Sequence, residues 1–122
     1  MKILLTGATG YIGKRLLPHL IKAGHHVVCL VRDKQRFSPP AHLIPHVSII
    51  EADLLEPMSL EVIPSEIDAA YYLVHSMSHS EDYLDLERNS AINFTQRISQ
   101  TNAQQVLYLG GIVNQNELSP HL

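Results

Sequence analysis

The sequence is poor in the features that mark membrane, secreted and nucleic-acid-binding proteins. Among its 122 residues Cys29 is the one cysteine, so no internal disulfide can form. No apolar run approaches the roughly 18 residues that span a bilayer, and Met1 and Lys2 lead directly into a strand-like segment. Nine basic against twelve acidic residues give a net charge of −3 and no basic face. We therefore expect a cytoplasmic domain that binds neither a membrane nor nucleic acid.

Glycine is also scarce, and its distribution is uneven. The chain has six glycines, and three of them, Gly7, Gly10 and Gly13, fall in its first thirteen residues. They occupy every third position of the stretch "TGATGYIG" (residues 6–13), which follows the apolar residues 3–5 directly. Such spacing indicates either a very tight turn or a ligand that must come close to the backbone.

The apolar residues are arranged as five short runs separated by helix-like segments. The runs cover residues 2–6, 26–32, 47–51, 69–74 and 106–109. Most are continuous rather than alternating, which is typical of parallel strands covered on both faces. We expect one helix that begins at Gly10 or Tyr11, runs to Ala23 and is closed by Gly24, and another over about 80–100. The connection 33–46 is expected to be mostly loop with at most a short helix, and one or two helical turns should begin at Pro57. This order predicts an α/β fold.

A glycine-rich turn between a first strand and a first helix is the sequence context of dinucleotide binding. Gly7 at the strand exit permits the tight turn, Gly10 lets a pyrophosphate approach the backbone N–H groups, and Gly13 permits close packing of helix on strand. The spacing is Gly-x-x-Gly-x-x-Gly, so the turn is one residue longer than in the ordinary Gly-x-Gly-x-x-Gly fingerprint. We interpret the stretch as a cradle for a dinucleotide.

The stretch "LLTGATGYIGKRLLPHLIKAGHHVVCLVRD" resembles the opening of the short-chain dehydrogenase/reductase superfamily. Its Thr-Gly-Ala-Thr-Gly-x-x-Gly form is similar to extended and atypical members, among them nucleotide-sugar epimerases and nitrogen-regulator-like proteins. "AAYYLVHSM" and "VLYLGGI" resemble the fourth and fifth strands of an atypical NAD(P)H-binding branch. The resemblance implies a Rossmann-type, doubly wound parallel sheet of strand order 3-2-1-4-5 inside a three-layer α/β/α sandwich.

The resemblance also implies which residues would touch the cofactor. Arg32 at the end of the second strand suits the 2′-phosphate of NADP, whereas Asp33 suits the ribose hydroxyls of NAD. We favour NADP, and NAD stays an alternative. In the family the residues corresponding to Asp53 and Leu54 contact adenine, and the end of the fourth strand runs beside the nicotinamide ribose. The expected cofactor-binding set is Gly7, Thr9, Gly10, Tyr11, Ile12, Gly13, Arg32, Asp33, Asp53, Leu54, Leu73, Val74 and His75.

The eight histidines do not indicate a metal site. His75 and His79 are four residues apart, but they lie at a strand end and in a loop, where that spacing does not place two ligands on one helical face. No third ligand is evident. Cys29 falls inside the second apolar run, where we expect a buried and unreactive thiol.

Catalysis is where the sequence departs from the superfamily. Its oxidoreductases carry a Tyr-x-x-x-Lys motif after the fifth strand, and these 122 residues contain none. We expect the chain, residues 1–122, to be the NAD(P)-binding, amino-terminal part of a longer protein. That protein would be an oxidoreductase or nucleotide-sugar epimerase with an unidentified small-molecule substrate. The alternative is a redox sensor or assembly protein that binds the dinucleotide without catalysis. An incomplete sheet edge could also pair with a second copy.

Overall fold

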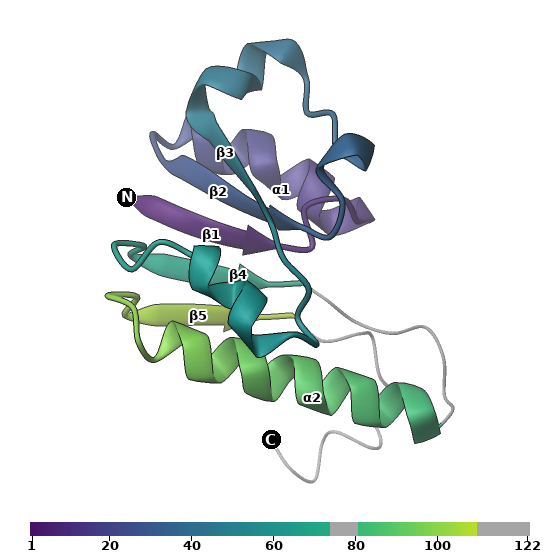
Figure 1. Ribbon diagram of the computed structural model, residues 1–122. Helices are drawn as coiled ribbons and strands as arrows, with labels where there is room; N and C mark the ends of the chain where they lie inside the picture. The colour runs from purple at the N-terminus through teal and green to yellow at the C-terminus, as the bar shows by residue number, and fades with distance from the viewer. Residues whose placement is uncertain (74–80, 110–122) are drawn as a thin grey trace, which may run out of the picture.

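A computed structural model describes residues 1–73 and 81–109, with the backbone alone for 81–83. Its centre is a sheet of five parallel strands (Figure 1). They are β1 (Lys2–Thr6), β2 (His26–Val31), β3 (Val47–Glu51), β4 (Ala69–Tyr72) and β5 (Gln105–Tyr108). The spatial order is β3-β2-β1-β4-β5, so the order inferred from the sequence is confirmed.

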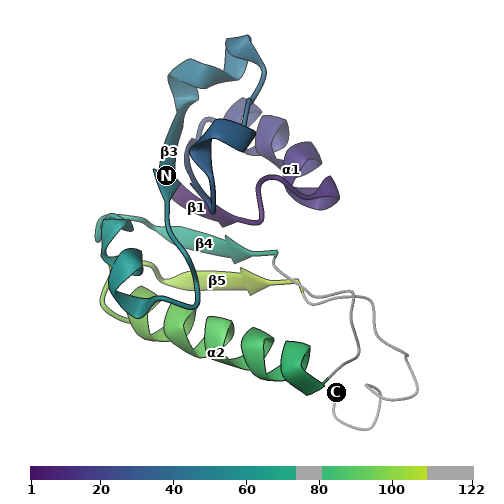
Figure 2. The same ribbon diagram turned by 45° about the vertical axis from the view of Figure 1, so that its right-hand side comes forward.

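Two α-helices lie on opposite faces of the sheet. The first, α1 (Tyr11–Lys22), lies against β1 and β2, and the second, α2 (Glu81–Ile98), runs along β4 and β5 (Figure 2). Strand residues alternate between the two sides: Ile3 and Leu5 pack in the cluster that contains the α1 residue Leu17. Leu4 packs in the cluster that contains the α2 residue Phe94. The doubly wound, three-layer arrangement follows from this alternation.

The connections hold three short 3₁₀ helices: η1 (Lys34–Arg36), η2 (Ala41–His46) and η3 (Pro57–Val62). The last begins at Pro57, as predicted. The connection expected to be mostly loop with at most a short helix contains two, η1 and η2. Asp33 caps the first, because its carboxylate accepts a hydrogen bond from the Gln35 N–H group. Helix α1 continues past Pro18 and is followed by Gly24, whose φ of +95° is the left-handed conformation expected there.

The carboxyl ends of four strands form one row across the sheet. Thr6 of β1 is in register with Leu30 of β2 on one side and Tyr72 of β4 on the other, and Tyr72 is in register with Tyr108 of β5. In parallel sheets ligands bind beyond these ends, at the point where the strand order reverses. Here that point lies between β1 and β4.

Two strand predictions need correction. We expected strands covered on both faces, but every residue of β5 is exposed, because β5 lies at the edge of the sheet. The second strand ends at Val31 and the fourth at Tyr72. Arg32 and Leu73 therefore each lie just past a strand and not inside one. Among residues 1–73 and 81–109, no helix has the length and apolar character needed to cross a bilayer.

Candidate functional site

The glycine turn between β1 and α1 is tight, and its three glycines meet different surroundings. Gly7 has a φ of +99°, a backbone conformation that residues with a Cβ atom rarely adopt. A Cβ on Gly13 would lie 2.1 Å from the carbonyl oxygen of Gly7, so this position accepts no side chain. A Cβ on Gly10 would meet only that same oxygen, at 3.4 Å. Gly10 therefore leaves open space beside the backbone, where the sequence predicts a pyrophosphate.

The first turn of α1 has unsatisfied backbone donors. Gly10 is the N-cap residue, no side chain caps the helix, and the first turn holds no acidic residue. The first intrahelical bond is donated by the Lys14 N–H group to the Gly10 carbonyl oxygen at 2.9 Å. The N–H groups of Tyr11, Ile12 and Gly13 precede it and have no acceptor within the helix. Such a helix start, at the positive end of the helix dipole, favours a bound anion.

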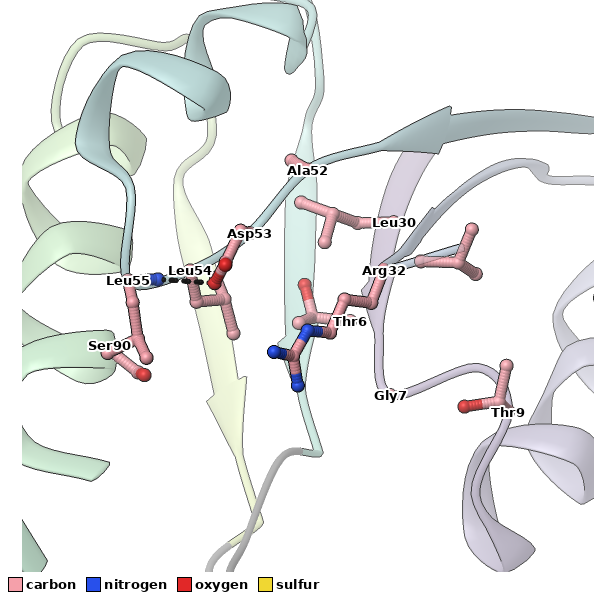
Figure 3. A pocket seen from close by; sticks show the side chains of 11 residues that line it. Thr6, Gly7, Thr9, Leu30, Arg32, Ala52, Asp53, Leu54, Leu55 and Ser90 are labelled. Atoms are coloured by element: carbon pink, nitrogen blue, oxygen red, sulfur yellow. Dashed lines mark hydrogen bonds between the residues drawn. The ribbon is translucent and has the colours of Figure 1, made fainter. Parts of the chain in front are cut away.

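A cavity of about 240 Å³ lies beyond the carboxyl ends of β1, β2 and β3 (Figure 3). Its walls come from four parts of the chain: the end of β1 and the glycine turn, the end of β2, the segment after β3, and α2. The lining residues are Thr6, Gly7, Thr9, Leu30, Val31, Arg32, Ala52, Asp53, Leu54, Leu55 and Ser90. The predicted residues Arg32, Asp53 and Leu54 thus meet around one space with the glycine turn.

The segment after β3 is held in a fixed turn. One carboxylate oxygen of Asp53 accepts a hydrogen bond from the Leu55 N–H group at 2.9 Å, which is the dashed line in Figure 3. The Ser59 hydroxyl accepts from the Asp53 N–H group at 3.0 Å. The side-chain amide of Asn93, on α2, donates to the Leu54 carbonyl oxygen at 2.8 Å. These bonds fix the position of Asp53 and Leu54 on the cavity wall without any ligand.

A second recess, of about 480 Å³, adjoins the glycine turn and is lined by Thr9, Arg32, Asp33 and Arg36. Within the described part of the chain, Arg32 has no ion-pair partner, whereas Arg36 Nε lies 3.7 Å from Asp33 Oδ2. The other Asp33 oxygen accepts from the Gln35 N–H group at 3.0 Å. Arg32 and Arg36 therefore both line one recess, and both oxygens of the neighbouring carboxylate are already engaged.

The structure places the other predicted residues unevenly. Leu73 lies against the glycine turn, since a Cβ on Gly7 would come within 3.0 Å of the Leu73 Cβ. Thr9 lines both spaces. The Tyr11 and Ile12 side chains are exposed, and the guanidinium of Arg15 lies 4.1 Å from the centroid of the Tyr11 ring. Val74 and His75 lie outside the described residues.

Among the polar or charged residues of this region, Thr6, Arg36, Ser90 and Asn93 are absent from the sequence-based set. Thr6 immediately precedes the glycine turn. A polar residue at the end of an otherwise apolar strand is the sequence feature that could have identified it. Arg36 could be found only by knowing that residues 34–36 form a 3₁₀ turn. Ser90 and Asn93 come from α2, roughly forty residues from the segment they approach, and no local pattern marks them.

Outside this region, two buried groups have shifted acidity. Burial raises the pKa of the Cys29 thiol to about 12, which keeps it protonated and unreactive, as expected for a core cysteine. Burial, and then the neighbouring Tyr108 and Glu87, raise the pKa of Tyr72 to about 12. Among the side chains of residues 1–73 and 84–109, no three of His, Cys, Asp or Glu are grouped so as to hold a metal ion.

Known proteins similar to this chain share its fold. An uncharacterized protein of Saccharomyces cerevisiae, YLL056C, is 28% identical over 93% of this chain and 39% of its own length. Yeast methylglyoxal/isovaleraldehyde reductase Gre2, solved with NADPH, has a TM-score of 0.72 at 14% identity, over 88% of this chain and 36% of that one. Triphenylmethane reductase of Citrobacter sp., solved with NADP(H), has a TM-score of 0.68 at 22% identity, over 88% and 37%.

This chain therefore spans less than two-fifths of the length of each of these proteins. A likeness to solved structures at such identities shows the fold alone. The family model is more specific: residues 3–113 match that of the NAD dependent epimerase/dehydratase family. That range holds the glycine turn and every residue that lines the two spaces described above. The chain belongs to the NAD dependent epimerase/dehydratase family.

Proposed function

We propose that this chain is the NADP(H)-binding part of an oxidoreductase. The glycine turn and the first turn of α1 hold the pyrophosphate, and the cavity after β3 takes the adenosine. The recess with Arg32 and Arg36 takes the 2′-phosphate. When bound, the nicotinamide supplies hydride transfer, and the protein supplies position and charge. Two similar proteins that share the fold, Gre2 and triphenylmethane reductase, were solved in complex with NADPH and NADP(H).

The observation that carries the preference for NADP is the pair of arginines around one recess. Arg32 is exposed and has no ion-pair partner in the described part of the chain. A phosphate between Arg32 and Arg36 would accept charge-assisted hydrogen bonds, which contribute about 1.5–3 kcal/mol each. NADH has only a hydroxyl at this position, so the same arginines contribute little to its binding.

The test is calorimetric titration of the full chain with NADPH and with NADH at matched salt. Tighter binding of NADPH is expected. Replacing either arginine, R32A or R36A, should lower the affinity for NADPH roughly tenfold to hundredfold and leave that for NADH nearly unchanged. R88A is the matched control, because Arg88 is an exposed arginine paired with Asp85 on α2, outside both spaces. Equal losses for the two dinucleotides would refute the phosphate role.

A second candidate is a dinucleotide-binding sensor or assembly protein without catalysis. The observation that favours it is the lack of a Tyr-x-x-x-Lys motif in these 122 residues. The two candidates differ in whether bound NADPH is consumed. Oxidation of NADPH by the longer protein that contains this chain, followed at 340 nm with a panel of aldehydes and ketones, supports the oxidoreductase. Tight binding by that longer protein with no oxidation across the panel supports the sensor.

A further inference from the structure

A third space, here named the α1 pocket, lies between the glycine turn, α1 and the connection from β2 to β3. It measures about 500 Å³. Its buried apolar floor comes from Ala8, Leu17, Phe37 and Leu43, which all pack in the hydrophobic cluster on the α1 face of the sheet. A concave space of this size with an apolar floor and a few polar groups is typical of a site for a small molecule.

The α1 pocket is separate from the cavity proposed for adenosine. The apolar wall of that cavity includes Leu30 and Ala52, which pack in the cluster on the α2 face of the sheet. Thr9, in the glycine turn, is the one described residue that lines both spaces. The two spaces therefore belong to opposite faces of the sheet, and a molecule in the α1 pocket would be a second ligand.

The walls of the α1 pocket are rigid before any ligand binds. Pro18 of α1 and the consecutive Pro39 and Pro40 line it, and a proline side chain loses almost no conformational freedom when it is covered. The connection that carries two of these prolines is held at both ends. The Phe37 N–H group donates to the Lys34 carbonyl oxygen at 3.2 Å, and the Leu43 N–H group donates to the Pro40 carbonyl oxygen at 2.9 Å. Preorganised walls of this kind lower the entropic cost of binding.

The charges at the α1 pocket have one sign. Lys14 and Arg36 line it, and none of the described residues that line it is acidic. Lys14 is exposed and forms no ion pair with another described residue. The ion pair between Arg36 and Asp33, at 3.7 Å, joins two largely exposed side chains and is therefore weak. Both cations are thus available to an anion, and the complementary ligand is an apolar molecule with one negative group.

We propose that the α1 pocket binds a small apolar carboxylate, which weakens the binding of NADPH. The apolar body packs on Leu17, Phe37 and the prolines, and the carboxylate accepts charge-assisted hydrogen bonds from Lys14 and Arg36. Arg36 also lines the recess proposed for the 2′-phosphate. Because carboxylate and phosphate use the same guanidinium, each should lower the affinity of the other by the same factor. The second ligand goes beyond the proposed function, and only its effect on NADPH rests on that function.

The first experiment is calorimetric titration of the full chain with 2-naphthoate, in the absence of dinucleotide. We expect a Kd of about 1 mM or lower. Binding of 2-naphthalenemethanol, which has the same rings without the charge, should be roughly tenfold weaker. Lys14→Gln should weaken the binding of 2-naphthoate roughly tenfold. Lys22→Gln is the matched control, because Lys22 is an exposed lysine in the last turn of α1, outside the pocket. No binding of 2-naphthoate, or equal affinities of the two variants, would overturn the inference.

The second experiment repeats the titrations with NADPH and NADH in the presence of saturating 2-naphthoate. The affinity for NADPH should fall roughly fivefold, and that for NADH should stay within about twofold, because only NADPH places a phosphate beside Arg36. Equal losses would mean that 2-naphthoate occupies the dinucleotide cavity, and an unchanged affinity for NADPH would mean that the two ligands do not share Arg36. Either result would overturn the inference. A chain that binds 2-naphthoate as expected but neither dinucleotide would retain the α1 pocket as a site and refute the proposed function.

Discussion

Strands β2 and β5 belong to one sheet and are both apolar, yet their surroundings differ. From Val27 to Val31 every residue of β2 is buried, whereas all four residues of β5 are exposed, with Val106 at 45% and Tyr108 at 65%. The difference follows from position. β2 lies between β1 and β3 and contributes to the clusters on both faces, whereas β5 is an edge strand. Hence an apolar run predicts a strand, while its burial depends on what the rest of the chain brings to it.

The two halves of the edge formed by the carboxyl ends of the strands also differ in how tightly they are held. Around β1, β2 and β3, the glycine turn and the segments that follow β2 and β3 are held by hydrogen bonds within the chain. Around β4 and β5, the described core contact is a stack of rings: Tyr72 lies 5.3 Å from Tyr108 and 4.6 Å from Phe94, centroid to centroid. A small change in side-chain shape should therefore lower the free energy of unfolding strongly in the first half and more weakly in the second.

The largest effect is expected at Gly13, in the tightly packed half. Gly13→Ala would place a Cβ 2.1 Å from the Gly7 carbonyl oxygen, so α1 must move away from the turn. We expect a loss of about 3 kcal/mol in the free energy of unfolding, measured with urea. Gly10→Ala is the control, because its Cβ would meet that oxygen at 3.4 Å, and we expect a loss of about 1 kcal/mol or less. Equal losses would show that the turn is looser than described.

A larger substitution at Gly10 should affect dinucleotide binding without affecting folding. Gly10→Val should leave the chain folded but prevent dinucleotide binding, because the larger side chain occupies the space beside the first turn of α1. Calorimetry with NADPH and circular dichroism on the same sample measure both properties. Retained binding would mean that the pyrophosphate does not lie at this turn.

A direct comparison of β2 with β5 uses one substitution in each. Val28, 1% exposed, and Val106, 45% exposed, are both valines within strands. Val28→Ala should lower the free energy of unfolding by about 2 kcal/mol, since it removes two buried methyl groups and leaves a cavity. Val106→Ala should cost roughly 0.5 kcal/mol. If Val106→Ala proved as costly as Val28→Ala, β5 would be covered in solution, for instance by a second copy.

Stability at alkaline pH tests the burial of Tyr72, whose ring contacts those of Phe94 and Tyr108. The pKa of Tyr72 is raised to about 12 in the folded protein, chiefly by burial, against 10.0 for an ordinary tyrosine. The neutral form is therefore favoured by folding. Its contribution is complete below pH 10 and is lost as the pH rises from 10 towards 12. Tyr72→Phe cannot ionise, so between pH 9 and pH 11 it should lose about 1 kcal/mol less stability than the wild type. Cys29 titrates equally in both proteins, so identical losses would contradict the burial of the Tyr72 hydroxyl.

How far the sequence predicts this molecule depends on whether a feature is local. The strands β1 and β3 and the start of η3 were predicted to the residue, and the start of α1 to within one residue, because glycine, proline and apolar runs act within a few residues. The exposure of β5 and the contacts of Ser90 and Asn93 depend on elements that are distant along the chain. The cofactor roles of the predicted residues stay predictions. The structure brings Arg32, Asp53 and Leu54 together around one cavity.

The smallest expected effect concerns Asp33, where the sequence left NAD and NADP both open. Its two carboxylate oxygens already engage the Gln35 N–H group and the Arg36 guanidinium, so we expect Asp33 to position Arg36 rather than bind a ribose. Asp33→Ser keeps an N-cap oxygen for η1, and the lost ion pair is exposed and weak. The affinity for NADH, measured by calorimetry, should therefore change by less than about twofold. Asp85→Ser, which removes a similar exposed pair with Arg88, is the control. A tenfold loss at Asp33 alone would make it a ribose ligand and would favour NAD, because a carboxylate that binds the 2′-hydroxyl repels a 2′-phosphate.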